Sequence, residues 1–455
     1  MQKPSETVDV PIQKFSAKGY GIGFLPVGKE IEIAHAAPGD IVRVEWRKKR
    51  EDPQKGRLLE VLTPSSTRIV PRCSHATVCG GCSWQQIRYD VQLQEKMERV
   101  KKAFGNHAVD PIIPCSNPFG YRNKMEFTFS QNGARTRFLG LMIAQAAPYV
   151  FNVNECHLCA PWFSSAVASV RNWWENTELE AYRPSKDCGT LRYLTLRESV
   201  RMKQKMAVLN ISGHSAYAPT RSDLDGFTAA IRNVAEDASI FLCIHQTKKG
   251  RPTQFVETRL AGPDHMIEQL HIAQSILSFK ISPVSFFQPN TLQAEKLYDT
   301  ALSLLEHPSV IYDLYCGTGT LGMAASRIAK KVIGIELSPE AVLDAKENLR
   351  FNGIQNMEIH QGDVGQTMRK FMASPSFCNP DAVLVDPPRA GLDPLAIQHL
   401  KYLSPRTIVY ISCNPITQAA NIKELVQAGY RIRRLQPVDQ FPHTYHIENI
   451  ALLEK

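Results

Sequence analysis

Hydrophobic and polar residues alternate along the first 62 residues of the chain. The alternation is clearest at residues 7–12, 41–46 and 58–61, and a period of two is typical of strands with one buried face. Glycines and prolines, among them Gly19, Gly28 and Pro38, separate these segments and favour turns. We therefore expect residues 1–62 to form a small antiparallel β-barrel that holds nucleic acid on one face, with the basic run at residues 47–50 on its rim.

The pattern over residues 63–283 is mixed. Tyr89, Leu93, Met97, Val100 and Phe104 recur at a spacing that places them on one face of a helix. Residues 125–129 and 207–211 are rich in apolar and β-forming residues, which is typical of strands. We predict a central α/β domain over these residues.

From residue 284 to residue 455, apolar runs alternate with helical patterns. Strands are expected at residues 309–314, 331–335, 357–360, 381–385, 406–411 and 447–453. Strands that alternate with helices predict a parallel, doubly wound sheet, and hence a Rossmann-like α/β domain. Ligands bind such sheets at the carboxyl ends of the strands.

Length and charge narrow the class of protein. A chain of 455 residues is long enough for about three domains. The net charge of +9 favours acidic partners, with nucleic acid the first candidate. The first residues lack the apolar core of a signal peptide, and no apolar run is long enough to span a bilayer. We expect a cytoplasmic protein without a membrane partner, whose 11 cysteines are reduced.

A glycine loop follows the first strand of the last domain. Gly317, Gly319 and Gly322 have the Gly-x-Gly-x-x-Gly spacing that lets the backbone approach a ligand closely. Glu336 ends the next strand, where a carboxylate can accept hydrogen bonds from both hydroxyls of a ribose. NAD and S-adenosylmethionine share this feature. The residues downstream, in particular Asp386 and Cys413, favour S-adenosylmethionine because a dehydrogenase has no use for them.

Cys413 follows the apolar run at residues 407–411, and Glu448 begins the last expected strand. Carbon 5 of uracil is a poor nucleophile, and a thiolate that adds to carbon 6 turns the ring into an enolate that can attack a methyl sulfonium. This chemistry needs an activated cysteine, a general base and a group that steadies the enolate. Cys413 can supply the thiolate and Glu448 the base, while Asp386 can hydrogen-bond the uracil edge or the donor.

A cluster of cysteines precedes the central domain. Cys73, Cys79 and Cys82 enclose two glycines, which let the backbone wrap a bulky centre. A fourth thiolate is available from Cys156 or Cys159. Four thiolates suit either tetrahedral zinc or a [4Fe–4S] cluster, and the chemistry alone leaves both open.

The block from Gln288 to Glu448 resembles the catalytic half of the RNA uracil-5 methyltransferase family. The matching stretches are Phe-Phe-Gln-Pro-Asn at 286–290, the loop at 313–320, Ile-Glu at 335–336, Asp-Pro-Pro-Arg at 386–389, Ser-Cys-Asn-Pro at 412–415 and His-x-Glu at 446–448. One position departs from the family pattern: Pro289 stands where an aliphatic residue is usual.

The resemblance implies roles for individual residues. The positions of the family that bind S-adenosylmethionine fall on Gln288, Tyr315, Glu336 and Asp386. The nucleophile falls on Cys413 and the base on Glu448.

The rest of the chain resembles the same family. Residues 1–62 resemble a TRAM domain, and the cysteine spacing is similar to that of members with a [4Fe–4S] cluster, whose ligands fall on Cys73, Cys79, Cys82 and Cys156. The resemblance implies a monomer that acts on a uridine of 23S ribosomal RNA, with transfer RNA as the second candidate.

Two other functions compete with this one. Methylation of carbon 5 of cytosine uses the same covalent logic, with Asp386 holding the ring nitrogen. An RNA-binding iron–sulfur module without catalysis would bind RNA but would not convert it to a product. The family-like Ser-Cys-Asn-Pro context at residues 412–415 favours uracil over cytosine. The joint presence of Gln288, Glu336, Asp386, Cys413 and Glu448 favours an enzyme over a module without catalysis.

Overall fold

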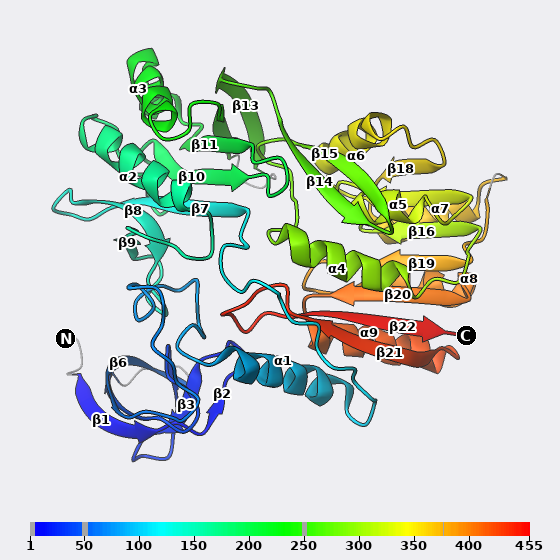
Figure 1. Cartoon of the computed structure of the whole chain (residues 1–455), viewed down its shortest axis with the longest axis horizontal. Helices are drawn as coiled ribbons and strands as arrows, with labels where there is room; N and C mark the ends of the chain where they lie inside the picture. The colour runs from blue at the N-terminus through cyan, green and yellow to red at the C-terminus, as the bar shows by residue number, and fades with distance from the viewer. Residues whose placement is uncertain (1–4, 48–52, 248–252, 376) are drawn as a thin grey trace.

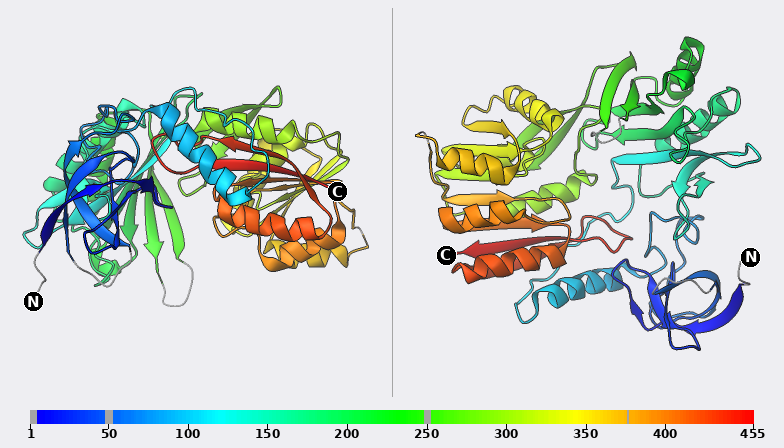
Figure 2. Two further views of the ribbon diagram at one scale, coloured as in Figure 1. Left: turned by 90° about the horizontal axis from the view of Figure 1, so that it is seen from below. Right: turned by 180° about the vertical axis from the view of Figure 1, so that it is seen from behind.

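The computed structural model describes residues 5–47, 53–247, 253–375 and 377–455 (Figure 1). A barrel-like N-terminal sheet and a central α/β domain lie on one side of the molecule, and a larger α/β domain lies on the other. Helix α1 (Tyr89–Phe104) reaches from the barrel side to the large domain (Figure 2). The expected fold class is confirmed. Residues 48–50 of the basic run lie outside the described residues.

The N-terminal sheet is curled and has the strand order β1-β5-β6-β4-β3-β2. Its strands are β1 (Glu6–Pro11), β2 (Lys14–Phe15), β3 (Gly21–Phe24), β4 (Glu30–Ile33), β5 (Ile41–Trp46) and β6 (Gln54–Thr63). The alternating residues Val10, Val42 and Val44 point into its core and are fully buried. The expectation of a wholly antiparallel barrel is wrong at one pairing, because β4 and β6 run parallel.

The central domain has a seven-stranded sheet in the order β13-β12-β11-β10-β7-β8-β9. Its strands are β7 (Lys124–Gln131), β8 (Arg137–Met142), β9 (Val150–Asn152), β10 (Leu191–Glu198), β11 (Lys205–Ser212), β12 (Ser239–Gln246) and β13 (Gln254–Ala261). Helices α2 (Pro161–Glu175) and α3 (Arg221–Arg232) pack on one face of this sheet, and a short 3-10 helix, Ser215–Tyr217, precedes α3. On the other face, Met206 and Phe241 pack against the hairpin of β14 (Met266–Ile272) and β15 (Ser275–Ile281).

The large domain contains a second seven-stranded sheet, in the order β18-β17-β16-β19-β20-β22-β21. Its strands are β16 (Val310–Leu314), β17 (Lys331–Glu336), β18 (Met357–Gln361), β19 (Ala382–Val385), β20 (Thr407–Ser412), β21 (Arg431–Val438) and β22 (Glu448–Glu454). Helices α4 (Thr291–Leu302), α5 (Thr320–Ala325) and α6 (Pro339–Phe351) cover one face. Helices α7 (Val364–Met372), α8 (Pro394–Leu403) and α9 (Pro415–Gln427) cover the other, together with α1.

The expectation of a wholly parallel sheet is wrong at its edge. β22 runs antiparallel to both β20 and β21. The sequence pattern missed β21, because Arg431, Arg433 and Arg434 interrupt its apolar residues. The reversed direction of β22 matters for the site, because it brings the first residue of β22 to the end of the sheet where the parallel strands have their carboxyl ends.

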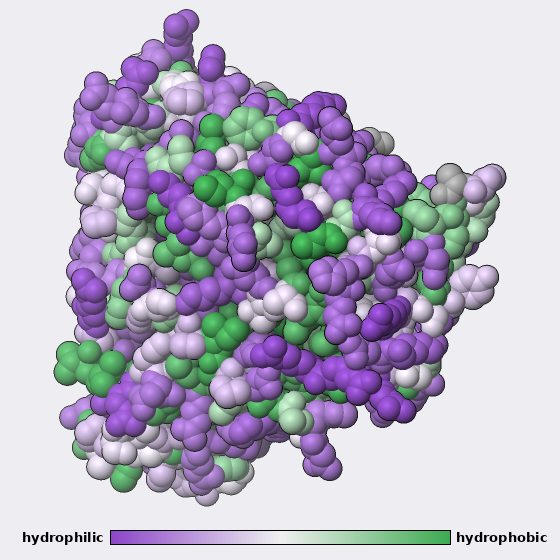
Figure 3. Space-filling model, turned by 45° about the vertical axis from the view of Figure 1, so that its right-hand side comes forward, coloured by the Kyte–Doolittle hydropathy of each residue, from purple (hydrophilic) through white to green (hydrophobic). Residues whose placement is uncertain are grey.

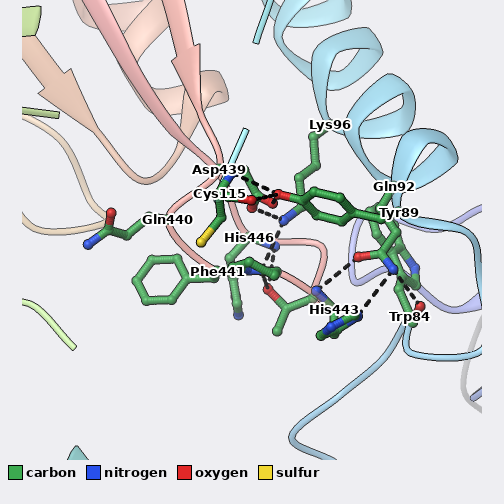
Figure 4. Close-up of polar contacts among 12 residues, drawn as sticks. Trp84, Tyr89, Gln92, Lys96, Cys115, Asp439, Gln440, Phe441, His443 and His446 are labelled. Atoms are coloured by element: carbon green, nitrogen blue, oxygen red, sulfur yellow. Dashed lines mark hydrogen bonds and ion pairs between the residues drawn. The ribbon is translucent and has the colours of Figure 1, made fainter. Parts of the chain in front are cut away.

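A buried ion pair joins α1 to the connection between β21 and β22. The Nζ atom of Lys96 lies 2.5 Å from Oδ1 of Asp439, and both side chains are fully buried (Figure 4). Lys96 also donates to the backbone oxygen of Phe441 at 2.9 Å, and the hydroxyl of Tyr89 donates to Oδ2 of Asp439 at 2.7 Å. Burial lowers the pKa of Lys96, and the adjoining carboxylate opposes this shift. The connection is therefore fixed at its first residues.

Replacement of Lys96 by methionine should destabilise the part of the molecule that contains α1 and β22 by about 3–5 kcal/mol, because the carboxylate of Asp439 would stay buried without its cation. Urea unfolding followed by tryptophan fluorescence measures the change. Lys101→Met, on the same helix, removes an exposed ion pair with Glu98 and should cost at most about 1 kcal/mol. Equal losses in the two variants would contradict this account.

Candidate active site

Cys413 lies between the end of β20 and the start of α9. Its side chain is half-buried. In the ladder between β20 and β22 the last pair is Ser412 with Asn449, so the next residues along each strand are Cys413 and Glu448. Residues directly opposite on antiparallel strands have Cβ atoms roughly 5 Å apart. The antiparallel direction of β22 thus brings the predicted nucleophile and the predicted base together.

A pair of buried amides holds these two elements in register. Nε2 of Gln418 on α9 donates to the backbone oxygens of Tyr410 and Asn449, at 2.8 and 3.0 Å. Nδ2 of Asn449 donates in turn to Oε1 of Gln418 at 2.8 Å. The helix that follows Cys413 and the strand that begins at Glu448 are therefore locked to each other. Neither amide had been singled out from the sequence.

The site concentrates carboxyl groups out of contact with water. Glu448 is 5 % exposed, and burial together with the charge of Asp386 raises its pKa well above the usual value. Burial raises the pKa of Asp386 to about 7. Burial and the charge of Glu448 raise the pKa of the Cys413 thiol to about 11, while Arg389 acts in the opposite direction. A buried carboxylate of this kind is a stronger base than an exposed glutamate.

The glycine loop after β16 turns sharply toward the same edge. Tyr315, Gly317 and Gly319 all have positive φ angles, of 63°, 54° and 80°. Glycine adopts this conformation without strain, whereas the tyrosine does not. The hydroxyl of Tyr315 donates to Oδ2 of Asp393 at 2.8 Å, which anchors the strained residue at the start of α8.

The residues around this loop fit a nucleoside-containing donor. The two carboxylate oxygens of Glu336 accept hydrogen bonds from the backbone N–H groups of Gly317 and Ser338, at 2.9 and 2.8 Å. Each oxygen keeps a second lone pair for a ribose hydroxyl. Asp313 lies beneath the loop and accepts a hydrogen bond from the N–H of Gly322 at 2.8 Å, and burial raises the pKa of Asp313 to about 8.

Gln288 approaches the site from the segment before α4. Its backbone oxygen accepts from Nδ2 of Asn123 in the central domain at 2.8 Å, and its Oε1 lies 3.5 Å from Nε2 of Gln440. Tyr298, a residue of α4, is buried. Its pKa is raised by burial and by the charges of Asp386 and Glu448. The sequence analysis missed Tyr298 and Gln440, because an apolar helix face and a loop glutamine carry no distinctive local signal.

The cysteine cluster forms a separate site. Cys73, Cys79, Cys82 and Cys156 line one small cavity between the cluster segment and the central domain. N–H groups donate to two of the sulfurs, from the backbone of Gly81 to Cys79 at 3.3 Å and from the side chain of Gln85 to Cys82 at 3.6 Å. Nδ1 of His75 lies 3.8 Å from the sulfur of Cys73.

Cys159 lies instead in the hydrophobic core of the central domain. The four thiols that share the cavity are the donor type found in thiolate-bound zinc sites and iron–sulfur clusters. Cys73 is also one of three residues, with His75 and Glu155, whose ligand atoms lie within 4.8 Å of one another.

Comparisons with known proteins agree with this geometry. The sequence profile described as tRNA (Uracil-5-)-methyltransferase matches residues 254–455. An uncharacterized RNA methyltransferase of Protochlamydia amoebophila is 46% identical over 441 residues, which cover 93% of this chain and 99% of that protein. The chain belongs to the RNA (uracil-5-)-methyltransferase family. A second uncharacterized RNA methyltransferase, from Caldanaerobacter subterraneus, is 33% identical and covers 99% of both chains.

A solved member of this family shares the whole architecture. The crystal structure of the Pyrococcus abyssi tRNA (uracil-54, C5)-methyltransferase in complex with S-adenosyl-L-homocysteine superimposes with a TM-score of 0.74 at 26% identity. It covers 98% of this chain and 100% of its own. The protein is thus an RNA methyltransferase that depends on S-adenosylmethionine.

On the side drawn in Figure 3, hydrophobic residues lie in groups among hydrophilic ones. Among the residues that the structure describes, no helix combines the length and the apolar character needed to cross a bilayer.

The Cys413 thiol should react slowly with iodoacetamide at neutral pH and faster as the pH rises. Burial raises the pKa of this thiol above its usual value, to about 11, and the thiolate is the reactive form. The rate should therefore rise about tenfold per pH unit well beyond the pH at which an ordinary cysteine levels off. Mass spectrometry of the Cys413 peptide measures the rate, with Cys413→Ala as the control. A reaction rate that levels off as expected for an ordinary thiol pKa of about 8.5 would contradict this prediction.

Proposed function

We propose that the protein methylates carbon 5 of a specific uridine in RNA through a covalent adduct on Cys413. The observation that carries the proposal is the pairing of β20 with the antiparallel β22, which sets Cys413 beside Glu448. The mutual influence of their charges, together with the nearby Asp386, supports a nucleophile and a base acting on one ring.

The proposed chemistry follows from these positions. The Cys413 thiolate adds to carbon 6 of the flipped uracil, and the electrons of the 5,6 double bond move onto carbon 5 and the ring carbonyl. S-adenosylmethionine supplies, when bound, a methyl group on a sulfonium. After carbon 5 has taken the methyl group, Glu448 removes the proton from carbon 5, the double bond re-forms, and the carbon–sulfur bond breaks to release the thiolate. Arg389 lies close enough to influence both groups electrostatically.

Four residues are proposed to hold the donor. Glu336 would bind the ribose hydroxyls through its free lone pairs, and Tyr315 and the glycine loop would line the path of the nucleoside. Gln288 and Asp386 would hold the part of the donor nearest to the uracil. Their support is the convergence of β16, β17, β19 and the segment before α4 at one edge of the sheet, where ligands of doubly wound sheets bind.

The cysteine site is proposed to hold a [4Fe–4S] cluster on Cys73, Cys79, Cys82 and Cys156. The shared cavity and the N–H groups directed at sulfur support this assignment, since such hydrogen bonds accompany iron–sulfur ligation. The cluster would order the segment that joins the barrel to α1. A zinc ion on the same thiolates is the alternative, and metal analysis distinguishes zinc from iron.

RNA binding is proposed to involve three parts of the chain: a TRAM-like barrel at residues 1–62, the cluster segment and central domain at 63–283, and the methyltransferase domain at 284–455. A net charge of +9 supports contacts with phosphate. We propose 23S ribosomal RNA as the first substrate. Transfer RNA is the second, and it is favoured by the activity named for the structurally similar Pyrococcus abyssi enzyme.

RNA that contains 5-fluorouridine should form a stable covalent complex with the protein in the presence of S-adenosylmethionine, because fluorine on carbon 5 cannot leave as a proton. A denaturing gel shows the complex as a shifted band. Transcripts of 23S ribosomal RNA and of transfer RNA, tested separately, identify the substrate.

Two variants serve as controls. Cys413→Ala should abolish both the band and methyl transfer, whereas Glu448→Gln should trap the adduct on ordinary uridine. Full methyl transfer by Cys413→Ala would refute the covalent scheme. Transfer to cytosine alone would refute the choice of base.

Cys156→Ala should lower the iron and acid-labile sulfide content of the purified protein and bleach its visible absorbance, because one of the four proposed ligands is lost. Cys159→Ala should leave both unchanged. Elemental analysis and absorbance spectra of the anaerobically purified proteins measure the difference. Zinc in place of iron would contradict the assignment. A loss of iron in Cys159→Ala but not in Cys156→Ala would also contradict it.

A further inference from the structure

Three aromatic side chains gather on one face of the central sheet, outside the proposed active site. His245 on β12 lies opposite Phe255 on β13, and their ring centroids are 4.8 Å apart at an interplanar angle of 87°. The ring of Tyr193 on β10 stands on the same face, with its centroid 5.2 Å from that of His245 at 88°. The rings of Tyr193 and Phe255 both meet the imidazole edge to face.

Hydrogen bonds fix the orientation of this group. Nδ2 of Asn210 donates to Oγ1 of Thr195 at 3.1 Å, so its Oδ1 is the atom that faces His245. Nε2 of His245, at 3.0 Å from that oxygen, must therefore carry the hydrogen. The Tyr193 hydroxyl lies 3.1 Å from the same nitrogen. Burial, with the positive charge of Arg192, lowers the pKa of His245 to about 4, so the imidazole is uncharged at neutral pH.

Only part of this sheet face is covered. Helices α2 and α3 pack on the opposite face, and Met206, Val208 and Phe241 on the inner half of this face pack toward the methyltransferase domain. Phe255 lies on the outer half and is 45% exposed. A large aromatic side chain, held by an ordered neighbour and open to water, is typical of a surface that stacks on a ligand.

The strand that carries Phe255 contacts the segment that leads to the proposed active site. Glu257 lies two residues beyond Phe255 on the same face of β13, about 7 Å along the strand. Its Oε1 accepts a hydrogen bond from the backbone N–H of Val284 at 3.1 Å. Val284 begins the segment that leads to Gln288. This hydrogen bond joins the strand of Phe255 to the segment before Gln288.

The surroundings suit a nucleotide better than an apolar peptide. The guanidinium of Arg192 lies 4.3 Å from the centroid of the Tyr182 ring and is close enough to act on His245. A cation beside aromatic rings can contact the phosphate of a nucleotide whose base lies on one of the rings. Open sheet faces with exposed aromatic residues, backed by two helices, bind unpaired bases in other proteins.

We propose that Phe255, supported by His245 and Tyr193, stacks on an unpaired base that neighbours the target uridine. The proposal rests on the proposed function in that the ligand is the RNA substrate. A target base that is flipped out of its stack leaves its neighbours without a partner. An aromatic platform next to the active site would stabilise that opened RNA.

The test measures binding without catalysis, in the Cys413→Ala background and with the metal site loaded as purified. Single-stranded RNA oligonucleotides that contain a uridine carry 2-aminopurine at each flanking position in turn. Stacking quenches the fluorescence of this base. Phe255→Ala should abolish the quenching at one position and weaken binding roughly tenfold or more, since stacking on one aromatic side chain contributes on that order. Phe255→Trp should restore both.

Val256→Ala is the matched control. Val256 is the next residue on the same strand, is 41% exposed and points to the opposite face, so its replacement should change neither signal. Quenching or affinity that is equal in Phe255→Ala and its parent would overturn the proposal, as would the absence of quenching at every position. Failure of the proposed function shows separately, as absence of methyl transfer from S-adenosylmethionine to RNA when Cys413 is intact.

Discussion

The ion pair between Lys96 and Asp439 determines where the rest of the site can lie. It is fully buried, so each charge depends on the other for compensation. Asp439 directly follows β21, and the segment after it leads to Glu448 at the start of β22. The position of the proposed base therefore depends on Lys96, a residue of α1. In the sequence, Lys96 precedes Val310, the first residue of the methyltransferase sheet, by more than two hundred residues.

The same connection also contacts the N-terminal half of the protein. The backbone N–H of Trp84 donates to the oxygen of His443 at 3.0 Å, and the backbone N–H of His443 donates to Oε1 of Gln92 at 2.9 Å. The indole of Trp84 donates to the backbone oxygen of Gly19 in the barrel at 2.8 Å. The barrel, the cysteine segment and the loop before Glu448 are thus joined through one tryptophan. These hydrogen bonds connect the barrel and the cysteine segment directly to the loop that precedes Glu448.

Local patterns in the sequence predicted the parallel part of the sheet and the motifs at its strand ends. Cys413, Asp386 and Glu336 stand directly after apolar runs, and such runs are reliable signs of buried parallel strands. The same method missed β21, whose arginines hide its apolar residues, and hence the antiparallel direction of β22. It also left Cys156 and Cys159 as alternatives for the fourth ligand, because the two cysteines stand only three residues apart in the sequence. Lys96 with Asp439, and Tyr193 with His245 and Phe255, come from distant segments and leave no local trace.

The carboxyl groups at the strand ends have a consequence for the order of events in a catalytic cycle. Asp313, Asp386 and Glu448 all have raised pKa values, in part because the charge of Asp386 acts on the other two. Such a pocket gains free energy from a cationic ligand and gains less from a neutral one. Loss of a methyl group turns a sulfonium into an uncharged thioether. If these residues hold the donor as proposed, charge favours replacement of the spent donor by the fresh one.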